Sequence, residues 1–247
     1  MRSRDEFDAV QRLIAAGVND CAIARQTGIP RPTVRDWRTR RPRALRPNTS
    51  TSPCGIDHDF SALTANAYSY LLGLYLGDGC ISRHPRAWCL RISLDTKYPG
   101  IIDCCRQAID LLMPGQRAAI IQQPGNCVQV THYSKHWPCL FPQHGPGLKH
   151  NRRIVLKGWQ ERIVLDEQPG MLLRGLVHSD GCRVLNWVNG TAYPRYHFSN
   201  RSDDIRAIFA EACRRLGIAC RSNNRWNLSV ARRDSVAKLD KFVGPKA

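Results

Sequence analysis

The sequence has no long hydrophobic run, comparatively few acidic residues and no cysteine pair with C-x-x-C spacing. No apolar stretch approaches the roughly 20 residues that a helix needs to span a bilayer. The N-terminal stretch MRSRDEFDAV lacks the apolar segment of a signal peptide. These absences argue against a membrane-spanning or exported protein, so we expect a cytoplasmic location and no membrane partner.

Acidic residues are scarce relative to basic ones. The 247 residues include 37 Lys and Arg against 20 Asp and Glu, a formal net charge of +17. Such an excess favours a polyanionic partner, most often nucleic acid. The alternative, binding to a membrane surface, is disfavoured because no long amphipathic basic helix concentrates the charge. Hydrophobic residues make up 43% of the chain, which is enough to form a core.

The eleven cysteines do not form a disulfide pattern. Their number is odd, and Cys104, Cys105 and Cys213 lie inside apolar periodic segments, as is typical of reduced, buried thiols. Cys54 and His58, in CGIDHDF, are candidate zinc ligands. Two ligands do not complete the four that a structural zinc site takes, so the sequence leaves this possibility open.

Residues 1–43 are predicted to form three short helices. Gly17 and Gly28 end the first two, Asp20 can cap the second, and Trp37 faces inward on the third. This pattern resembles a helix-turn-helix of the homeodomain or recombinase type. Arginines on or beside the third helix would then contact DNA, namely Arg35, Arg38, Arg40 and Arg41. A small helical module that binds protein is the alternative. Residues 44–60 are rich in Pro, Arg, Ser and Thr and are interpreted as a linker.

The rest of the chain contains the same pattern of elements twice, over residues 61–158 and 159–247. Each half reads as the element order αββαββα, with amphipathic helices such as YPGIIDCCRQAIDLLM and SDDIRAIFAEACRRLG between the predicted strand pairs. Repeats of this length suggest two halves related by a pseudo-twofold axis.

Each half begins with a helix that carries small residues four positions apart. In LLGLYLGDG (71–79) these are Gly73 and Gly77, and in LRGLVHSDG (173–181) they are Gly175 and Ser179. Small residues with this spacing share one helix face and let two backbones approach closely. We therefore expect these four residues to form the interface between the two helices.

Both helices end in an aspartate, Asp78 or Asp180, followed by Gly79 or Gly181 as an expected left-handed cap. A carboxylate at this end faces the negative pole of the helix dipole, and two converging carboxylates raise each other's pKa. A divalent cation such as Mg²⁺ would stabilise the arrangement. An Asp-Gly turn is common by itself, but two copies in matching contexts favour a shared metal site.

At these residues the sequence resembles the LAGLIDADG homing endonucleases in their single-chain, two-motif form, over roughly residues 61–247. Both copies keep the leucines, the small positions and the final Asp-Gly, whereas Leu76 and His178 replace the motif's earlier acidic residue. The resemblance implies an α+β fold: two pseudo-twofold-related αββαββα repeats whose saddle of antiparallel strands lies in the DNA major groove.

The resemblance also implies the activity and its cofactor. We expect a functional monomer that cuts double-stranded DNA across the minor groove with Mg²⁺, for which Mn²⁺ is expected to substitute, using one motif aspartate per strand. Gly77 and Ser179 would join the two acids as metal ligands, and Lys149 and Lys246 would orient solvent. For each lysine, a plain phosphate contact is the alternative.

Base readout would come from polar side chains on the strands, since Arg suits guanine and Asn or Gln suits adenine. Alternation along the strands should leave about half of the candidates facing DNA. The candidates for base readout are Arg91, Gln122, Gln123, Asn126 and Gln129 in the first half, and Asn200, Arg221, Asn223, Asn224, Arg225 and Asn227 in the second. Lys97 and Arg201, at the ends of the predicted strands, are candidates for a further polar role near the metals, with a plain phosphate contact to DNA as the alternative.

Two other functions remain open from the sequence. One is a non-cleaving transcriptional regulator on the same scaffold, which the N-terminal helices support. The retained Asp78 and Asp180 argue against it, since an inactive scaffold has no need of two mutually repelling acids. The other is an RNA-binding splicing helper, for which the sequence shows no stacked-aromatic strand motif.

Overall fold

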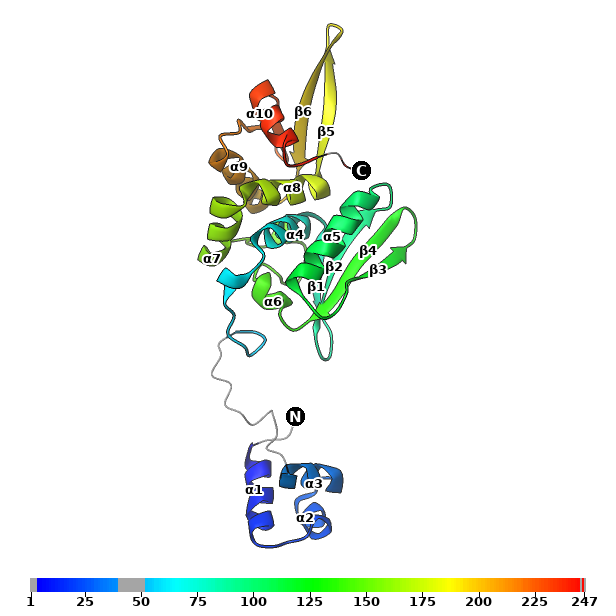
Figure 1. Ribbon diagram of the computed structural model, residues 1–247, viewed down its shortest axis with the longest axis vertical. Helices are drawn as coiled ribbons and strands as arrows, with labels where there is room; N and C mark the ends of the chain where they lie inside the picture. Colours follow the sequence, from blue (N-terminus) through cyan, green and yellow to red (C-terminus); the bar gives the residue numbers. More distant parts are fainter. Residues whose placement is uncertain (1–3, 40–51, 245, 247) are drawn as a thin grey trace. The chain divides into compact units, whose positions relative to one another are not determined.

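The computed structural model describes residues 4–39, 52–244 and 246 of the chain. It divides the chain into two compact units, Met1–Thr51 and Ser52–Ala247, which are treated separately below (Figure 1). No helix within the described residues is long and apolar enough to cross a membrane.

The first unit consists of the three expected helices, α1 (Arg4–Ala15), α2 (Asp20–Thr27) and α3 (Arg31–Thr39). They enclose a small core of Phe7, Val10, Ile23, Ile29, Val34 and Trp37. The cap of α2 is Asn19 rather than Asp20, because the Asn19 side chain accepts a hydrogen bond from the Ala22 amide. Gly28 ends α2 in the left-handed conformation, as predicted.

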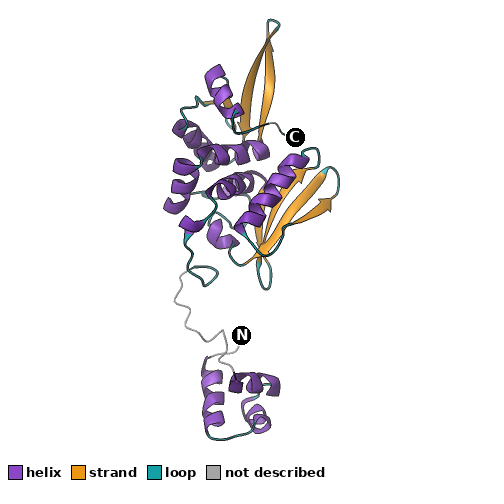
Figure 2. Ribbon diagram, viewed as in Figure 1, coloured by secondary structure: helices purple, strands orange, loops and turns teal. Residues whose placement is uncertain are grey.

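The second unit repeats one element order twice, which confirms the predicted α+β fold (Figure 2). The first half contains α4 (Ala65–Asp78), β1 (Gly79–Arg83), β2 (Trp88–Asp95), α5 (Pro99–Leu112), β3 (Ala119–Gln123), β4 (Cys127–Ser134) and α6 (Trp137–Leu140). The second half contains α8 (Pro169–Asp180), β5 (Gly181–Val188), β6 (Thr191–Ser199), α9 (Asp203–Arg215), β7 (Arg221–Ser222), β8 (Asn227–Val230) and α10 (Arg233–Asp240). Between the halves lie α7 (Gly158–Glu161) and a π-helical turn (Arg162–Glu167), and short 3-10 turns cover Phe60–Ala62 and Lys149–Asn151.

Each half builds one four-stranded antiparallel sheet. The strand orders are β1-β2-β4-β3 and β5-β6-β8-β7, so the two sheets have the same topology. Gly79 pairs with Ile92 in the first sheet, and Gly181 pairs with Phe198 in the second. Both motif helices therefore lead directly into the outer strand of their own sheet. In Figure 1, α4 and α8 lie side by side between the two sheets.

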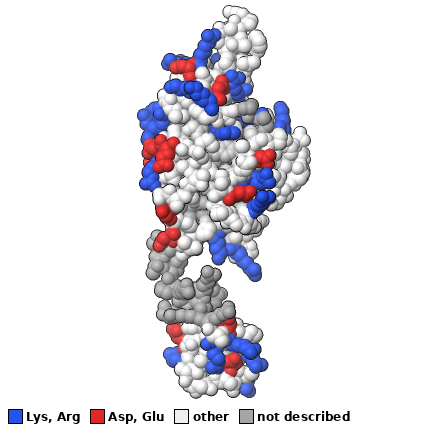
Figure 3. Space-filling model, in the orientation of Figure 1, with Lys and Arg blue, Asp and Glu red and all other residues white. Residues whose placement is uncertain are grey.

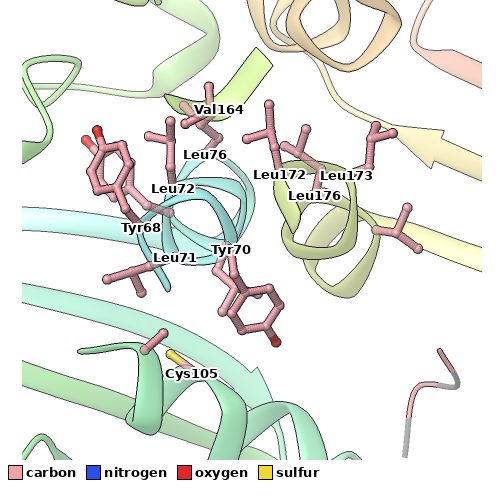
Figure 4. Packing of buried hydrophobic residues seen from close by; sticks show 14 of the residues in the cluster. Tyr68, Tyr70, Leu71, Leu72, Leu76, Cys105, Val164, Leu172, Leu173 and Leu176 are labelled. Atoms are coloured by element: carbon pink, nitrogen blue, oxygen red, sulfur yellow. The ribbon is translucent and has the colours of Figure 1, made fainter. Parts of the chain in front are cut away.

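The crossing of α4 and α8 forms the centre of the core. Their leucines are fully buried and surround the contact (Figure 4), among them Leu71, Leu72, Leu172, Leu173 and Leu176. At the contact itself, a Cβ added to Gly73 would lie 2.6 Å from the Leu172 carbonyl oxygen and 2.8 Å from the Gly175 Cα. The helices therefore meet backbone to backbone, as the small residues predicted.

The two glycines that follow the acids differ from the expectation. Gly79 (φ −94°) and Gly181 (φ −111°) are extended rather than left-handed, because each begins a strand immediately. Glycine is needed there for space: an added Cβ would lie 2.6 Å from the Tyr75 Cα at Gly79 and 2.7 Å from the Val177 Cα at Gly181. The strand thus leaves the helix by folding tightly against its last turn.

We expect Gly175→Ala to lower the free energy of unfolding by about 3 kcal/mol, because its Cβ would overlap the backbone of α4. The measurement is urea unfolding of the full chain, followed by tryptophan fluorescence. Gly158→Ala is the matched control, since nothing lies within 4 Å of the added Cβ. Equal unfolding midpoints for the two variants would show that the crossing tolerates side chains.

Candidate active site at the helix crossing

The two acids come together where α4 and α8 end. Gly77 lies against the Ser179 side chain, and a Cβ added to Gly77 would be 3.1 Å from the Asp180 Oδ2. The carboxylate of the second half thus lies next to the helix that carries Asp78. This is the convergence that the duplicated motif predicts, and it places two like charges in one small volume.

The environment of the acids raises their pKa values. Burial, and then the charge of Asp180, raise the pKa of Asp78 to about 6, against the opposing influence of Lys149 and Lys246. Burial also raises the pKa of Asp180. As a whole residue Asp78 is exposed, so solvent moderates this shift, but the neighbouring acid acts in the same direction. Both carboxylates are therefore poised to gain from a nearby cation.

Two lysines occupy equivalent positions beside the acids. Lys149 Nζ donates to the Tyr75 and Gly77 carbonyl oxygens, at 2.6 Å each. Lys246 Nζ lies 3.4 Å from the carbonyl oxygen of Ser179. Each ammonium group therefore approaches the carbonyl that precedes the acid of its own half. Burial lowers the pKa of Lys149 to about 8 and also lowers that of Lys246.

The oxygen atoms at this place fit a hard divalent cation. Mg²⁺ is bound by carboxylate and carbonyl oxygens. Asp78 and Asp180 supply carboxylates, and Gly77 and Ser179 supply carbonyls that already attract positively charged lysines. An ion bound here would share the Gly77 carbonyl with Lys149 or displace its ammonium group. The four residues expected as metal ligands thus lie together where the two helices end, and their coordination of a metal stays a prediction.

Asn200 belongs to the site rather than to a free strand surface. Its Nδ2 donates to the Asp180 Oδ2 at 2.6 Å, and its Oδ1 accepts from the Ser202 amide at 2.8 Å. Within the described residues, no hydrogen bond of this kind reaches the Asp78 carboxylate. Asn200 was expected to contact DNA, but its side-chain amide is instead hydrogen-bonded to Asp180. The two halves of the site are thus chemically unequal.

An open pocket of about 460 Å³ lies beside Asp180. Its lining mixes expected site residues with His150 and Trp226, which sequence reasoning missed, and comprises Leu76, Gly77, Leu148, Lys149, His150, Asp180, Ser199, Asn200, Arg201, Trp226 and Asn227. Arg201 and Arg225 lie over the Trp226 ring, at 5.3 and 5.7 Å from its centroid. Asn227 accepts a hydrogen bond from Ser199. The pocket therefore presents a positively charged rim next to one acid.

The first sheet divides the expected DNA contacts between its two faces. Arg91 pairs with Thr131, and Gln129 pairs with Ile121, so these side chains share a face with Gln123. Gln122 pairs with Val128, whose side chain is in the core, and therefore points to the opposite face. Lys97 follows β2 and lies 5.5 Å from the Tyr98 ring, which Lys246 also approaches at 5.9 Å.

The second sheet has the same division. Arg221 pairs with Ser229, which pairs with His197, so all three point away from the core residues Tyr196 and Phe198. Arg195 lies two residues before His197 and shares this face. Sequence reasoning missed Arg195 and His197, although their alternation with buried aromatic residues was a readable signal.

In the first unit, the expected DNA-contacting arginines differ in their surroundings. Arg38 forms an ion pair with Asp20 at 2.8 Å and donates to the Val18 carbonyl, so it ties α3 to the start of α2. Arg35 is exposed, as is Arg31 on the same helix. Arg40 and Arg41 lie outside the described residues, as does the first part of the expected linker, residues 44–51.

Residues 52–60, expected as the end of the linker, belong to the second unit. There, the Phe60 ring stacks on Trp159 with a centroid distance of 3.9 Å. The predicted linker therefore includes a segment that packs on the duplicated domain.

Two helices cross on glycine, end in paired acids and each lead into a ββαββα set, and comparison with solved structures finds proteins of similar fold. The chain is similar to the homing endonuclease I-WcaI bound to its DNA recognition sequence, with 12% identity and a TM-score of 0.50, covering 74% of this chain and 83% of that one. It is also similar to the N-terminal LAGLIDADG domain of DUF199/WhiA, with 12% identity and a TM-score of 0.45, covering 73% and 83%. No protein-family model and no curated protein matches the sequence. The predicted resemblance is thus confirmed at the level of the fold.

Proposed function

We propose that the protein is a site-specific double-stranded DNA endonuclease of the LAGLIDADG homing type that hydrolyses phosphodiester bonds with a divalent metal ion. The observation that carries the proposal is the convergence of Asp78 and Asp180 at the helix crossing. Burial and the charge of Asp180 raise the pKa of Asp78, and burial raises the pKa of Asp180, so keeping both acids ionised here costs stability. Their retention in both halves has a chemical reason if they hold a cation.

The residues of the site have distinct proposed roles. Asp78, Asp180 and the carbonyls of Gly77 and Ser179 would hold Mg²⁺ or Mn²⁺, which would activate water and polarise the scissile phosphate. Lys149 and Lys246 supply fixed positive charge beside the acids, where charge develops on phosphate oxygens. Asn200 holds one oxygen of Asp180 in place.

Double-stranded DNA is the proposed partner. Lys and Arg outnumber Asp and Glu over the chain, and they are spread widely over the face shown in Figure 3. Arg91 and Gln129 on one sheet, and Arg195 and Arg221 on the other, lie on the faces turned away from the core. Because one chain supplies both acids, a monomer is the proposed active form.

The proposal is tested by incubating the full chain with a randomised duplex library in Mg²⁺ or Mn²⁺, with Ca²⁺ as the control. We expect double-strand breaks at a restricted sequence in Mg²⁺ and Mn²⁺, and binding with little cleavage in Ca²⁺. Selective retention of duplexes without breaks in any metal would contradict the nuclease function.

That second result would support the other candidate, a non-cleaving DNA-binding regulator. The observation that favours it is the three-helix unit, whose α3 carries the exposed Arg31 and Arg35. A separate DNA-binding unit increases affinity for a site through phosphate contacts whether or not the site is cut.

We expect Asn200→Ala to slow cutting of one strand about 10-fold, so that nicked DNA accumulates. The reason is that Asp180 loses its amide hydrogen bond, whereas Asp78 has no such partner within the described residues. The measurement is the ratio of nicked to linear product from a supercoiled plasmid that carries the target. Asn66→Ala, an exposed amide in the first turn of α4, is the control. Equal slowing of both strands would refute the asymmetry.

We expect the single-turnover cleavage rate to rise with pH up to about 6 and to stay level from there to about pH 8. Metal binding needs the ionised Asp78, whose pKa is raised to about 6, so protons compete with the metal below that pH. Well below it, the rate should fall roughly tenfold per pH unit at limiting Mg²⁺. Excess Mg²⁺ should shift the curve to lower pH. A rate that is independent of pH from about 5 to 7 would exclude this role for Asp78.

A further inference from the structure

A second group of metal-ligating side chains lies outside the paired-acid site. Cys54, His58 and Cys139 place one Sγ or imidazole nitrogen each within 4.8 Å of one another. The Cys54 Sγ is 3.0 Å from the His58 Nε2. Cys54 and His58 come from the start of the second unit, whereas Cys139 is buried in α6. The fold has therefore joined two segments separated by about eighty residues of sequence.

His136 adds a fourth potential ligand, the second that bears an imidazole nitrogen. Its ring is perpendicular to that of His58, with a centroid distance of 5.0 Å. Its Nδ1 is buried and, within the described residues, has no hydrogen-bond partner. A buried imidazole nitrogen without a partner is costly, and metal coordination would satisfy it. The four residues also give the spacings Cys-x₃-His and His-x₂-Cys. Cys139 of the second pair reaches the first pair directly, and His136 contacts it through the His58 ring.

We propose that Cys54, His58 and Cys139, with His136 as the fourth ligand, bind a structural Zn²⁺ ion. Zinc takes thiolate sulfur at about 2.3 Å and imidazole nitrogen at about 2.0 Å in a tetrahedron, which places ligand atoms roughly 3.5 Å apart. The ligand atoms of Cys54, His58 and Cys139 are already grouped close to this arrangement, and His136, whose ring touches that of His58, would complete it by turning its imidazole. Its two thiols and two imidazoles form a soft donor set, unlike the all-oxygen set at Asp78 and Asp180. The two sites would therefore select different metals.

A disulfide between Cys54 and Cys139 is the main alternative. The two cysteines are free in the structure. A disulfide would also leave both histidines without a role and the His136 Nδ1 unsatisfied. Zinc accounts for all four side chains at once.

The proposed ion has a physical task in this fold. Residues 52–58 form a turn in which Ser52 Oγ accepts from the Ile56 amide at 3.0 Å, while the Ile56 side chain is 55% exposed. This turn therefore has little apolar burial to hold it. Zinc would fasten it to α6 at the residues where the second unit begins, immediately after the segment that leads from the first unit. It would act by stabilising the fold, independently of DNA cleavage.

The test is the metal content of the purified full chain, measured by mass spectrometry. We expect about one zinc per chain in the wild type, and its loss in Cys54→Ser and in Cys139→Ser. Cys127→Ser, which removes another half-buried free cysteine, should keep the zinc. Asp78→Asn should also keep it, which separates this site from the paired acids.

A second measurement does not depend on the folding of any variant. Wild-type protein stripped with a chelator should bind Co²⁺ with the visible absorption of tetrahedral thiolate coordination, and Zn²⁺ should displace it. Stripped protein should also be cut faster by protease within residues 52–60. Wild-type protein that holds no zinc and gives no thiolate–Co²⁺ spectrum would overturn the proposal. So would a thiol count two below that of the reduced chain, which would indicate the disulfide.

Discussion

Asp78→Asn is expected to lower double-strand cleavage by about 10³-fold or more while leaving DNA affinity nearly unchanged. Asparagine keeps the size of the side chain but removes the negative charge that would hold the cation. The cleavage rate and the dissociation constant are measured on the same duplex, in Mg²⁺ and in Ca²⁺. Asp103→Asn, which neutralises an exposed acid on α5, is the control.

The same substitution should make the metal-free protein slightly more stable. The pKa of Asp78 is about 6 in the folded chain, above its ordinary value of 3.8, so the ionised form is disfavoured by folding. Wild-type stability is therefore lost as pH rises from about 4 to 6, and the asparagine variant avoids that loss. Because the residue is exposed, the expected gain is only about 1 kcal/mol at pH 7, read from urea unfolding in a chelator. A variant that loses cleavage through misfolding would instead be less stable.

Lys149→Met should produce the other large effect, a loss of cleavage of about 10²-fold. Methionine fills much of the same space but cannot donate to the Tyr75 and Gly77 carbonyls, and it removes a positive charge beside both acids. DNA affinity should fall far less than the cleavage rate. Lys241→Met, which removes an exposed lysine, is the control.

The outcome that would contradict this role is specific. If Lys149 acts only as a phosphate contact, Lys149→Met should weaken DNA binding and leave the cleavage rate of the saturated complex unchanged. A pH profile adds a second readout, because burial lowers the pKa of Lys149 to about 8. The wild-type rate should decline above about pH 8 as the ammonium group is lost, and the methionine variant should lack this decline.

The features that the sequence predicted are those encoded by local spacing. Gly73 and Gly175 share a four-residue spacing with Gly77 and Ser179, and this alone indicates two helices in close contact. The repeated order of helices and strands then determines that both acids reach the same end of the crossing. Residues close in sequence were sufficient for that inference, and the structure places Asp78 and Asp180 accordingly.

The features that the sequence could not give depend on contacts between distant segments. Asn200 was expected to read DNA, and only the path of β6 beside α8 shows that its amide meets Asp180. Arg38 was likewise expected at DNA, but the packing of α3 on α2 pairs it with Asp20. Gly79 was expected to be left-handed as the cap that ends the helix, whereas a strand begins there at once and the residue is extended.

The cysteine and histidine group could likewise be predicted only in part from the sequence. Cys54 and His58 were visible as two possible ligands, four residues apart. The other half of the group, on and beside α6, is joined to them only by the fold. No local pattern connects residues that far apart, so the sequence could not complete the set.

The most direct test of the central claim compares wild-type protein with the Asp78→Asn, Asp180→Asn double variant on one selected duplex. Both proteins are first bound to the duplex in Ca²⁺, the complexes are purified, and the metal is exchanged for Mg²⁺ while strand ends are mapped by sequencing. The account predicts a double-strand break at one position from the wild type and intact DNA from the double variant, with both complexes formed. Intact DNA from the wild type, or equal cleavage by the double variant, would show that the paired acids at the helix crossing are not a nuclease centre.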